Sequence, residues 1–95
     1  MRVVYSKRAL ADLEQIANYY VAHASHTISE SIRHQLLSVI GRIARNPDSA
    51  PRVSQRTQVR AATIIRYPFR IFYRVNDEGI DILHIRHTSR RPSEM

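Results

Sequence analysis

The sequence has no cysteine, no tryptophan, only two glycines and a single lysine among its 95 residues. The absence of cysteine excludes a disulfide framework, a thiolate zinc site and a cysteine nucleophile, and it fits a reducing cytoplasm. The two glycines, Gly41 and Gly79, are too few for either of the glycine-rich nucleotide-binding loops. No apolar run is long enough to span a membrane, and the start of the chain does not resemble a signal peptide. We therefore expect a cytoplasmic protein with no membrane partner.

The charge that is present is almost entirely arginine. Fifteen Lys+Arg residues stand against eight Asp+Glu, which gives a formal net charge of +7, and Lys7 is the only lysine. Residues 1–50 hold six cations and four acids, whereas residues 51–95 hold nine cations and four acids. A solubilising surface would mix both signs and use lysine freely. Because arginine binds phosphate or carboxylate with a planar fork, the surplus indicates an anionic partner, nucleic acid first and an acidic protein second.

The first half of the chain predicts a short strand followed by two helices. Val3–Tyr5 is β-prone, and Ser6 is a suitable N-cap for a helix whose apolar residues repeat at helical spacing until about residues 23–25. A capping box over Thr27–Glu30 opens a second amphipathic helix, which Asn46–Pro47 ends. Two such helices joined by a short link form a helical hairpin.

The second half of the chain predicts three strands. Residues 47–58 form a polar, proline-punctuated loop, Tyr67-Pro68 is typical of a turn, and residues 76–79 form a hairpin loop. The last strand has apolar residues on both faces, so we expect it to be central in the sheet. The predicted strands span residues 59–66, 69–76 and 80–87.

Together these elements predict an α+β fold of order β-α-α-β-β-β, with the helical hairpin on one face of a mainly antiparallel sheet. A chain of this length forms one domain, residues 1–95. Alternation along the second of the three strands then assigns its side chains to two faces. The face covered by the helices carries Phe69, Ile71, Tyr73 and Val75. The opposite, open face presents Arg70, Phe72 and Arg74.

The histidine pairs do not predict a metal site. His84 and His87 lie three apart on a strand, so their side chains point to opposite faces. His23 and His26 lie in the link between the helices with no third ligand nearby. We expect neither a metal nor a cofactor.

One group of residues could carry out chemistry. A metal-independent ribonuclease needs a base for the 2′-hydroxyl, an acid for the leaving oxygen, and cations for the phosphate charge. His87 is the best acid or base because an unperturbed imidazole titrates near ~6.5, and Arg70, Arg90 and Arg91 can only stabilise charge. In the alternative, His87 is a plain strand-end histidine and the arginines hold a protein partner.

Two segments resemble a known protein superfamily. Following Tyr5-Ser6, the first predicted helix reads A-x-x-D-L-x-x-I-x-x-Y from Ala9, and the predicted hairpin reads R-I-x-Y-R-V from Arg70. The chain then closes on H-x-x-R from His87. In order, spacing and length, residues 2–91 resemble the ParE/RelE superfamily, the toxins of type II toxin–antitoxin modules, and the long helical hairpin resembles ParE more closely.

This resemblance implies the RelE-like fold, which has the same β-α-α-β-β-β order, and it implies a partner. Superfamily members inhibit growth, serve plasmid stabilisation, and are neutralised by a cognate antitoxin. The C-terminal segment of the antitoxin wraps the toxin, and its N-terminal domain binds operator DNA. The toxin therefore meets operator DNA only through the antitoxin.

The resemblance leaves two molecular targets open. ParE-like members inhibit DNA gyrase without being enzymes, whereas RelE-like members are mRNA interferases, endoribonucleases that act on the ribosome. For the second activity the catalytic residues would be Arg70, His87 and Arg90, because Arg70 matches the hairpin arginine and Arg90 the closing arginine. Ribonuclease members commonly carry several lysines that this sequence lacks, so gyrase is the favoured target and the ribosome with its mRNA the alternative.

The arginine-rich surface is the predicted site for the target or the antitoxin, whichever target applies. A third reading is a plain nucleic-acid-binding module, which would bind naked RNA or DNA with a steep dependence on salt. The predicted binding residues are Arg60, Arg66, Arg70, Phe72, Arg74, Arg86 and Arg91.

Overall fold

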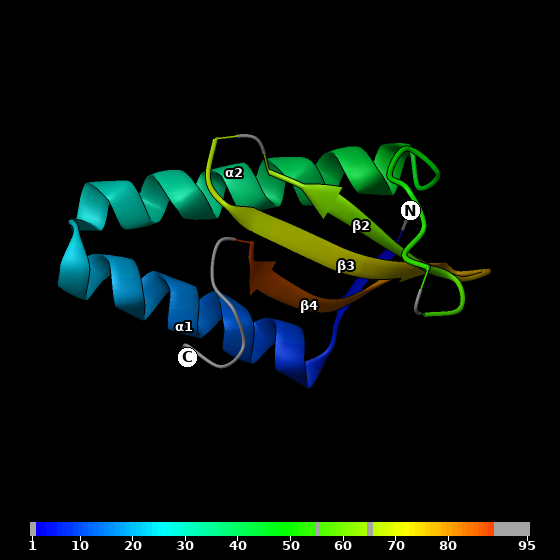
Figure 1. Ribbon diagram of the computed structural model, residues 1–95, viewed down its shortest axis with the longest axis horizontal. Helices are drawn as coiled ribbons and strands as arrows, with labels where there is room; N and C mark the ends of the chain where they lie inside the picture. Colours follow the sequence, from blue (N-terminus) through cyan, green and yellow to red (C-terminus); the bar gives the residue numbers. More distant parts are fainter. Residues whose placement is uncertain (1, 55, 65, 89–95) are drawn as a thin grey trace.

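The computed structural model describes residues 2–54, 56–64 and 66–88 of the chain (Figure 1). Its elements follow the predicted order, and the α+β fold is confirmed. The elements are β1 (Arg2–Tyr5), α1 (Lys7–His23), α2 (His26–Arg45), β2 (Val59–Thr63), β3 (Phe69–Val75) and β4 (Gly79–His87).

The four strands form one mixed sheet in the order β1-β4-β3-β2. β1 pairs with β4 in parallel, and the other two pairings are antiparallel, which makes β4 central as predicted. Figure 1 shows α1 and α2 as a hairpin lying along the sheet, with the turn between the helices at one end of the molecule. No helix in the described part of the chain is long and apolar enough to cross a membrane.

The helix boundaries agree with the predicted ends but not with one predicted start. Ser6 caps α1, since its Oγ accepts a hydrogen bond from the backbone N–H of Ala9 at 2.9 Å. The capping box predicted at Thr27 was wrong. Ser25 is the N-cap of α2, and its Oγ accepts from the N–H of Ile28 at 3.0 Å. Serine and threonine are both good caps, so local pattern alone could not choose between neighbouring positions.

The predicted inner face of the sheet is confirmed. Phe69, Ile71 and Tyr73 of β3 are buried in the main core, with Val75 packed against its edge. The helices meet them with apolar side chains at helical spacing. From α2 these are Ile32, Leu36, Val39, Ile40 and Ile43.

The predicted outer face is less open than expected. Phe72 is only 5% exposed, because it packs with Val59, Ala61, Leu83 and Val53 in a second, smaller apolar cluster. Val53 comes from the 47–58 loop, whose 51–53 segment is hydrogen-bonded along the edge of β2. This loop therefore covers part of the outer face and also protects an edge strand.

A β-bulge on β4 changes which of its side chains share a face. Phe72 pairs with His84 but Tyr73 pairs with Ile82, so Leu83 is an extra residue in the ladder. As a result, Ile82 and Ile85 both belong to the main core, although strict alternation would separate them. β2 is also shorter than predicted, ending at Thr63.

Candidate functional site

The end of β4 is fixed to α1 through side-chain hydrogen bonds. β1 pairs with β4 only as far as Ile82, and beyond that residue no other strand among the described residues lies along this edge of β4. Ser6 Oγ donates to the carbonyl of Leu83 at 2.7 Å, and Asp12 Oδ2 accepts from the N–H of Ile85 at 2.9 Å. These bonds satisfy backbone groups that β1 leaves unpaired, and they hold the segment that carries His84 and its neighbours.

The outer face of the sheet carries two stacked rings below an arginine. The rings of Phe72 and His84 lie 4.4 Å apart with an interplanar angle of 8°. The guanidinium of Arg70 lies over Phe72, 5.0 Å from the ring centroid, a cation–π arrangement. Arg86 is the cross-strand partner of Arg70, so both arginines belong to this face.

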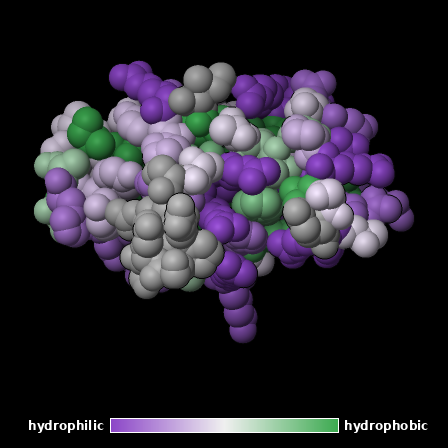
Figure 2. Space-filling view, viewed as in Figure 1, coloured by the Kyte–Doolittle hydropathy of each residue, from purple (hydrophilic) through white to green (hydrophobic). Residues whose placement is uncertain are grey.

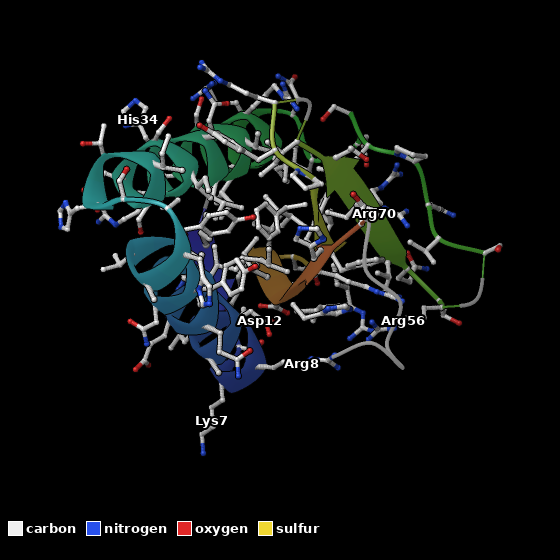
Figure 3. The ribbon with its side chains drawn as sticks, turned by 60° about the vertical axis from the view of Figure 1, so that its left-hand side comes forward. Lys7, Arg8, Asp12, His34, Arg56 and Arg70 are labelled. Atoms are coloured by element: carbon white, nitrogen blue, oxygen red, sulfur yellow. The ribbon has the colours of Figure 1, made fainter. Side chains whose placement is uncertain are left out.

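Further arginines reach this stack from other elements. Burial lowers the pKa of His84 below its ordinary value of 6.5, and Arg8, Arg56 and Arg86 lower it further, whereas Asp12 opposes them. The imidazole is therefore neutral at pH 7. Figure 3 shows Arg8 extending from the start of α1 toward the side on which Arg56 lies, while Lys7 points away. We call the group of Arg8, Arg56, Arg70 and Arg86 the arginine cluster.

No carboxylate pairs with the arginine cluster within the described residues. The ion pairs there join Arg2 to Glu78 at 3.7 Å and Arg60 to Asp48 at 3.2 Å. Figure 2 shows that hydrophilic side chains dominate one broad face of the molecule. The cluster thus carries positive charge that no ion pair within the described residues neutralises, and Asp12 is the carboxylate that acts on the same histidine.

The remaining predicted binding residues are dispersed. Arg60 lies on the helix side of the sheet edge, where its guanidinium donates to the carbonyl of Ala50 at 2.6 Å and pairs with Asp48. It therefore fastens the loop that follows α2. Arg66 is exposed beside the ring of Tyr67, and Arg74 is exposed on β3. Arg91, like Arg90, lies outside the described residues.

His87 does not share a face with Arg70. Arg70 pairs with Arg86 on the outer face, whereas His87 pairs with Phe69 of the main core, and their rings meet edge to face at 5.2 Å. The register of β3 against β4 therefore separates His87 from Arg70, two residues grouped from the sequence by their chemistry. The predicted separation of His84 from His87 is confirmed. His87 instead borders a pocket of about 230 Å³ against α1, lined by Asp12, Gln15, Ile16, Tyr19, Tyr20, Phe69 and Ile85.

A second, more apolar groove lies along the helical hairpin. Its volume is about 380 Å³, and it lies between α1 and α2. Two of its apolar side chains are unusually exposed for their size, Leu10 at 54% and Leu37 at 40%. Leu13, Ile16, Ala17 and Leu36 also line it.

The sequence profile of one protein family matches residues 3–92, and that family is described as the ParE toxin of the type II toxin–antitoxin system, parDE. The chain belongs to the ParE toxin family. No curated protein matches its sequence significantly. Membership of the ParE family confirms the predicted toxin–antitoxin class, and such a class supports an antitoxin partner.

Solved structures agree with the ParE assignment. A chain in the chromosomal ParDE TA system from P. aeruginosa is similar with a TM-score of 0.84 and 26% identity, over 94% of this chain and 97% of that chain. The isolated E. coli RelE toxin is similar with a TM-score of 0.59 and 15% identity, over 97% and 88% of the two chains. For the intact E. coli RelBE complex the TM-score is again 0.59 and the identity 15%, over 94% and 96%. The RelE likeness shows a shared fold.

Sequence reasoning missed several residues of the arginine cluster and its surroundings. Arg8 and Asp12 both lie on α1. Arg8 acts on His84 of the outer face, and Asp12 bonds to the edge of β4. No local sequence pattern predicts either contact. Arg56 lies in the acid-free stretch from Arg52 to Arg74, so its charge was a usable signal. The buried, stacked position of His84 depends on the bulge, and no signal in the sequence predicts it.

Proposed function

We propose that this ParE-family chain is the toxin of a type II toxin–antitoxin module, that it inhibits DNA gyrase without catalysis, and that a cognate antitoxin neutralises it. The observation that carries this proposal is the family match over residues 3–92, together with the 0.84 TM-score to a chain of a ParDE system. The toxin acts in the cytoplasm and meets operator DNA only through the antitoxin.

The geometry of the described residues supports binding rather than catalysis. A ribonuclease site needs its acid or base and its phosphate-binding cations around one reacting atom. His87 and Arg70 lie on opposite faces of the sheet, and His84 is buried against Phe72 in its neutral form. His87 is therefore not beside Arg70, and His84 is too buried to exchange a proton with a substrate there.

The hairpin groove is the part of the surface best suited to the antitoxin. An antitoxin segment with apolar side chains would bury Leu10 and Leu37, which the isolated chain leaves exposed. Acidic residues flanking that segment would complement the net charge of +7. The groove offers apolar anchoring, which the outer face with its buried rings does not.

Expression in growing cells, with two parallel readouts, tests the target. Inhibition of gyrase predicts filamentation and a DNA-damage response while protein synthesis continues in the first minutes after induction. Co-expression of the antitoxin should abolish both effects. Arrest of translation before any DNA damage would contradict the proposal.

The alternative is a RelE-like mRNA interferase, favoured by a pocket that His87 and Asp12 both line. It predicts mRNA cleavage at codon positions in a translating extract. His87→Gln would abolish that cleavage, whereas intact mRNA in a poisoned extract would exclude the alternative.

A further inference from the structure

We propose that the arginine cluster, Arg8, Arg56, Arg70 and Arg86, binds the phosphate backbone of nucleic acid directly, so that the toxin itself contacts DNA or RNA. This goes beyond the proposed inhibition of gyrase, which requires only contact with a protein. Recognition of the operator sequence stays with the antitoxin, whereas the contact proposed here is independent of sequence. It also requires no cleavage of the nucleic acid.

The cluster converges from four separate elements on one small area. Arg8 comes from α1, Arg56 from the loop before β2, Arg70 from β3 and Arg86 from β4. Arg70 and Arg86 are cross-strand partners on the outer face, and Arg70 lies over Phe72, the ring stacked on His84. Figure 3 shows Arg8 extending toward the side on which Arg56 lies, and both also act electrostatically on His84. Like charges brought together repel, and within the described ranges no carboxylate offsets them with an ion pair. An external anion would relieve that repulsion.

The chemistry of the area favours phosphate over an acidic peptide. Phe72 is 5% and His84 is 8% exposed, so the floor of the site offers no apolar pocket to anchor peptide side chains. Neither the pocket beside His87 nor the groove along the helical hairpin is lined by a member of the cluster. Guanidinium groups bind phosphate in a bidentate manner, and regularly spaced phosphates suit a flat cationic surface. Because the two rings are covered, bases cannot stack on them, and binding should be independent of sequence.

The test measures binding of the full chain to three fluorescent probes as a function of salt. The probes are a duplex DNA of about 20 base pairs, a single-stranded RNA of similar length, and poly-glutamate as the acidic-peptide surrogate. Four phosphate contacts predict a slope of about −3.6 for log K against log salt on duplex DNA, a loss of about 150-fold between about 50 and 200 mM.

Two matched double variants locate the site. Arg8→Gln with Arg56→Gln removes two charges from the cluster and should reduce the slope to about −1.8, which leaves a loss of about 12-fold over the same salt range. Lys7→Gln with Arg33→Gln removes two charges elsewhere, and both are exposed helix residues. This control should keep the wild-type slope. Arg56→Gln with Arg86→Gln repeats the test on loop and strand, and far-UV circular dichroism verifies that each variant is folded.

Each outcome decides the proposal. The proposal is supported if binding of DNA, RNA or both depends on salt, is lost in the cluster variants and is kept in the control. Comparison of the DNA and RNA affinities then shows which nucleic acid the cluster prefers. Equal weakening in cluster and control variants would show that net charge alone attracts the probe and would overturn the proposal. Tighter binding of poly-glutamate than of either nucleic acid, or no binding of nucleic acid at low salt, would overturn it too.

Discussion

The carboxylate of Asp12 accepts a hydrogen bond from the backbone N–H of Ile85 at 2.9 Å, across 73 positions of the chain. The acceptor comes from α1 and the donor from the part of β4 that lies beyond the end of β1. Together with the bond from Ser6 to Leu83, this contact supplies hydrogen-bond partners to backbone groups of β4 that β1 does not pair. The contact lies two residues from the bulge at Leu83.

Replacement of Asp12 by alanine should destabilise the fold. The N–H of Ile85 is partly buried and would lose its acceptor, at a cost of about 1–3 kcal/mol in the free energy of unfolding. Asp12→Asn keeps an oxygen acceptor and should cost less. Urea unfolding measures both. Glu14→Ala, an exposed acid on the same helix, should change stability by less than about 0.5 kcal/mol. An Asp12→Ala variant as stable as Glu14→Ala would contradict the assigned role.

Arg60 should prove to be a structural residue. Its guanidinium bonds to the Ala50 carbonyl and pairs with Asp48, and its side chain is only 16% exposed. Arg60→Ala should therefore lower the free energy of unfolding by about 1–2 kcal/mol. Arg66→Ala, an exposed arginine with only a ring contact, should change it by less than about 0.5 kcal/mol. Equal midpoints of thermal unfolding for the two variants would contradict this structural role of Arg60.

Stability should fall as the pH is lowered through the titration of His84. Burial first, and then Arg8, lower the pKa of His84 in the folded chain; Asp12 opposes them, and Arg56 and Arg86 lower the pKa by smaller amounts. The unfolded chain binds a proton near the ordinary value of 6.5, so protons favour unfolding. The full contribution is present well above pH 6.5 and is lost progressively below it.

His84→Phe keeps a flat ring against Phe72 and removes the titration. The free energy of unfolding of this variant, measured by urea titration from pH 8 to pH 5.5, should depend less steeply on pH than that of the wild type. His34→Gln, which changes an exposed histidine of α2, should keep the wild-type dependence. A His84→Phe curve parallel to the wild type would refute the role of His84.

The features predictable from the sequence were those that depend on neighbours along the chain. Alternation along β3 correctly placed Phe69, Ile71 and Tyr73 against the helices, and the cap at Ser6 follows from one side chain and one turn of helix. The bulge at Leu83 has no local signature, because a single extra residue in a β-rich stretch leaves composition unchanged. Alternation counted without the bulge would place Ile82 and Ile85 on opposite faces, whereas both lie in the main core.

The candidate site was less predictable than the fold because its parts lie far apart in sequence. Arg8 is brought near His84 only when α1 packs beside β4, whereas Arg86 lies two residues from His84 on the same strand. Phe72 was expected to be open because nothing in the 47–58 loop reveals that Val53 folds back over it. His87 and Arg70 were grouped by chemistry, but only the register of β3 against β4 decides which residues share a face.

Charged substitutions in the hairpin groove should weaken the antitoxin complex. Leu10→Glu and Leu37→Glu place a carboxylate where an apolar partner side chain would be buried, so each should reduce antitoxin affinity at least about tenfold. Val21→Glu is the matched control, since Val21 is 49% exposed on α1 but does not line the groove. Isothermal titration calorimetry with the cognate antitoxin measures all three. Unchanged affinity for both leucine variants would place the antitoxin elsewhere.

The most direct test of the central claim is DNA supercoiling by purified gyrase in the presence of the purified toxin. We predict that the wild type and His87→Gln both block supercoiling at micromolar concentration, that added antitoxin restores it, and that neither protein cuts mRNA in a translating extract. Uninhibited gyrase, together with mRNA cleavage that His87→Gln abolishes, would contradict the account.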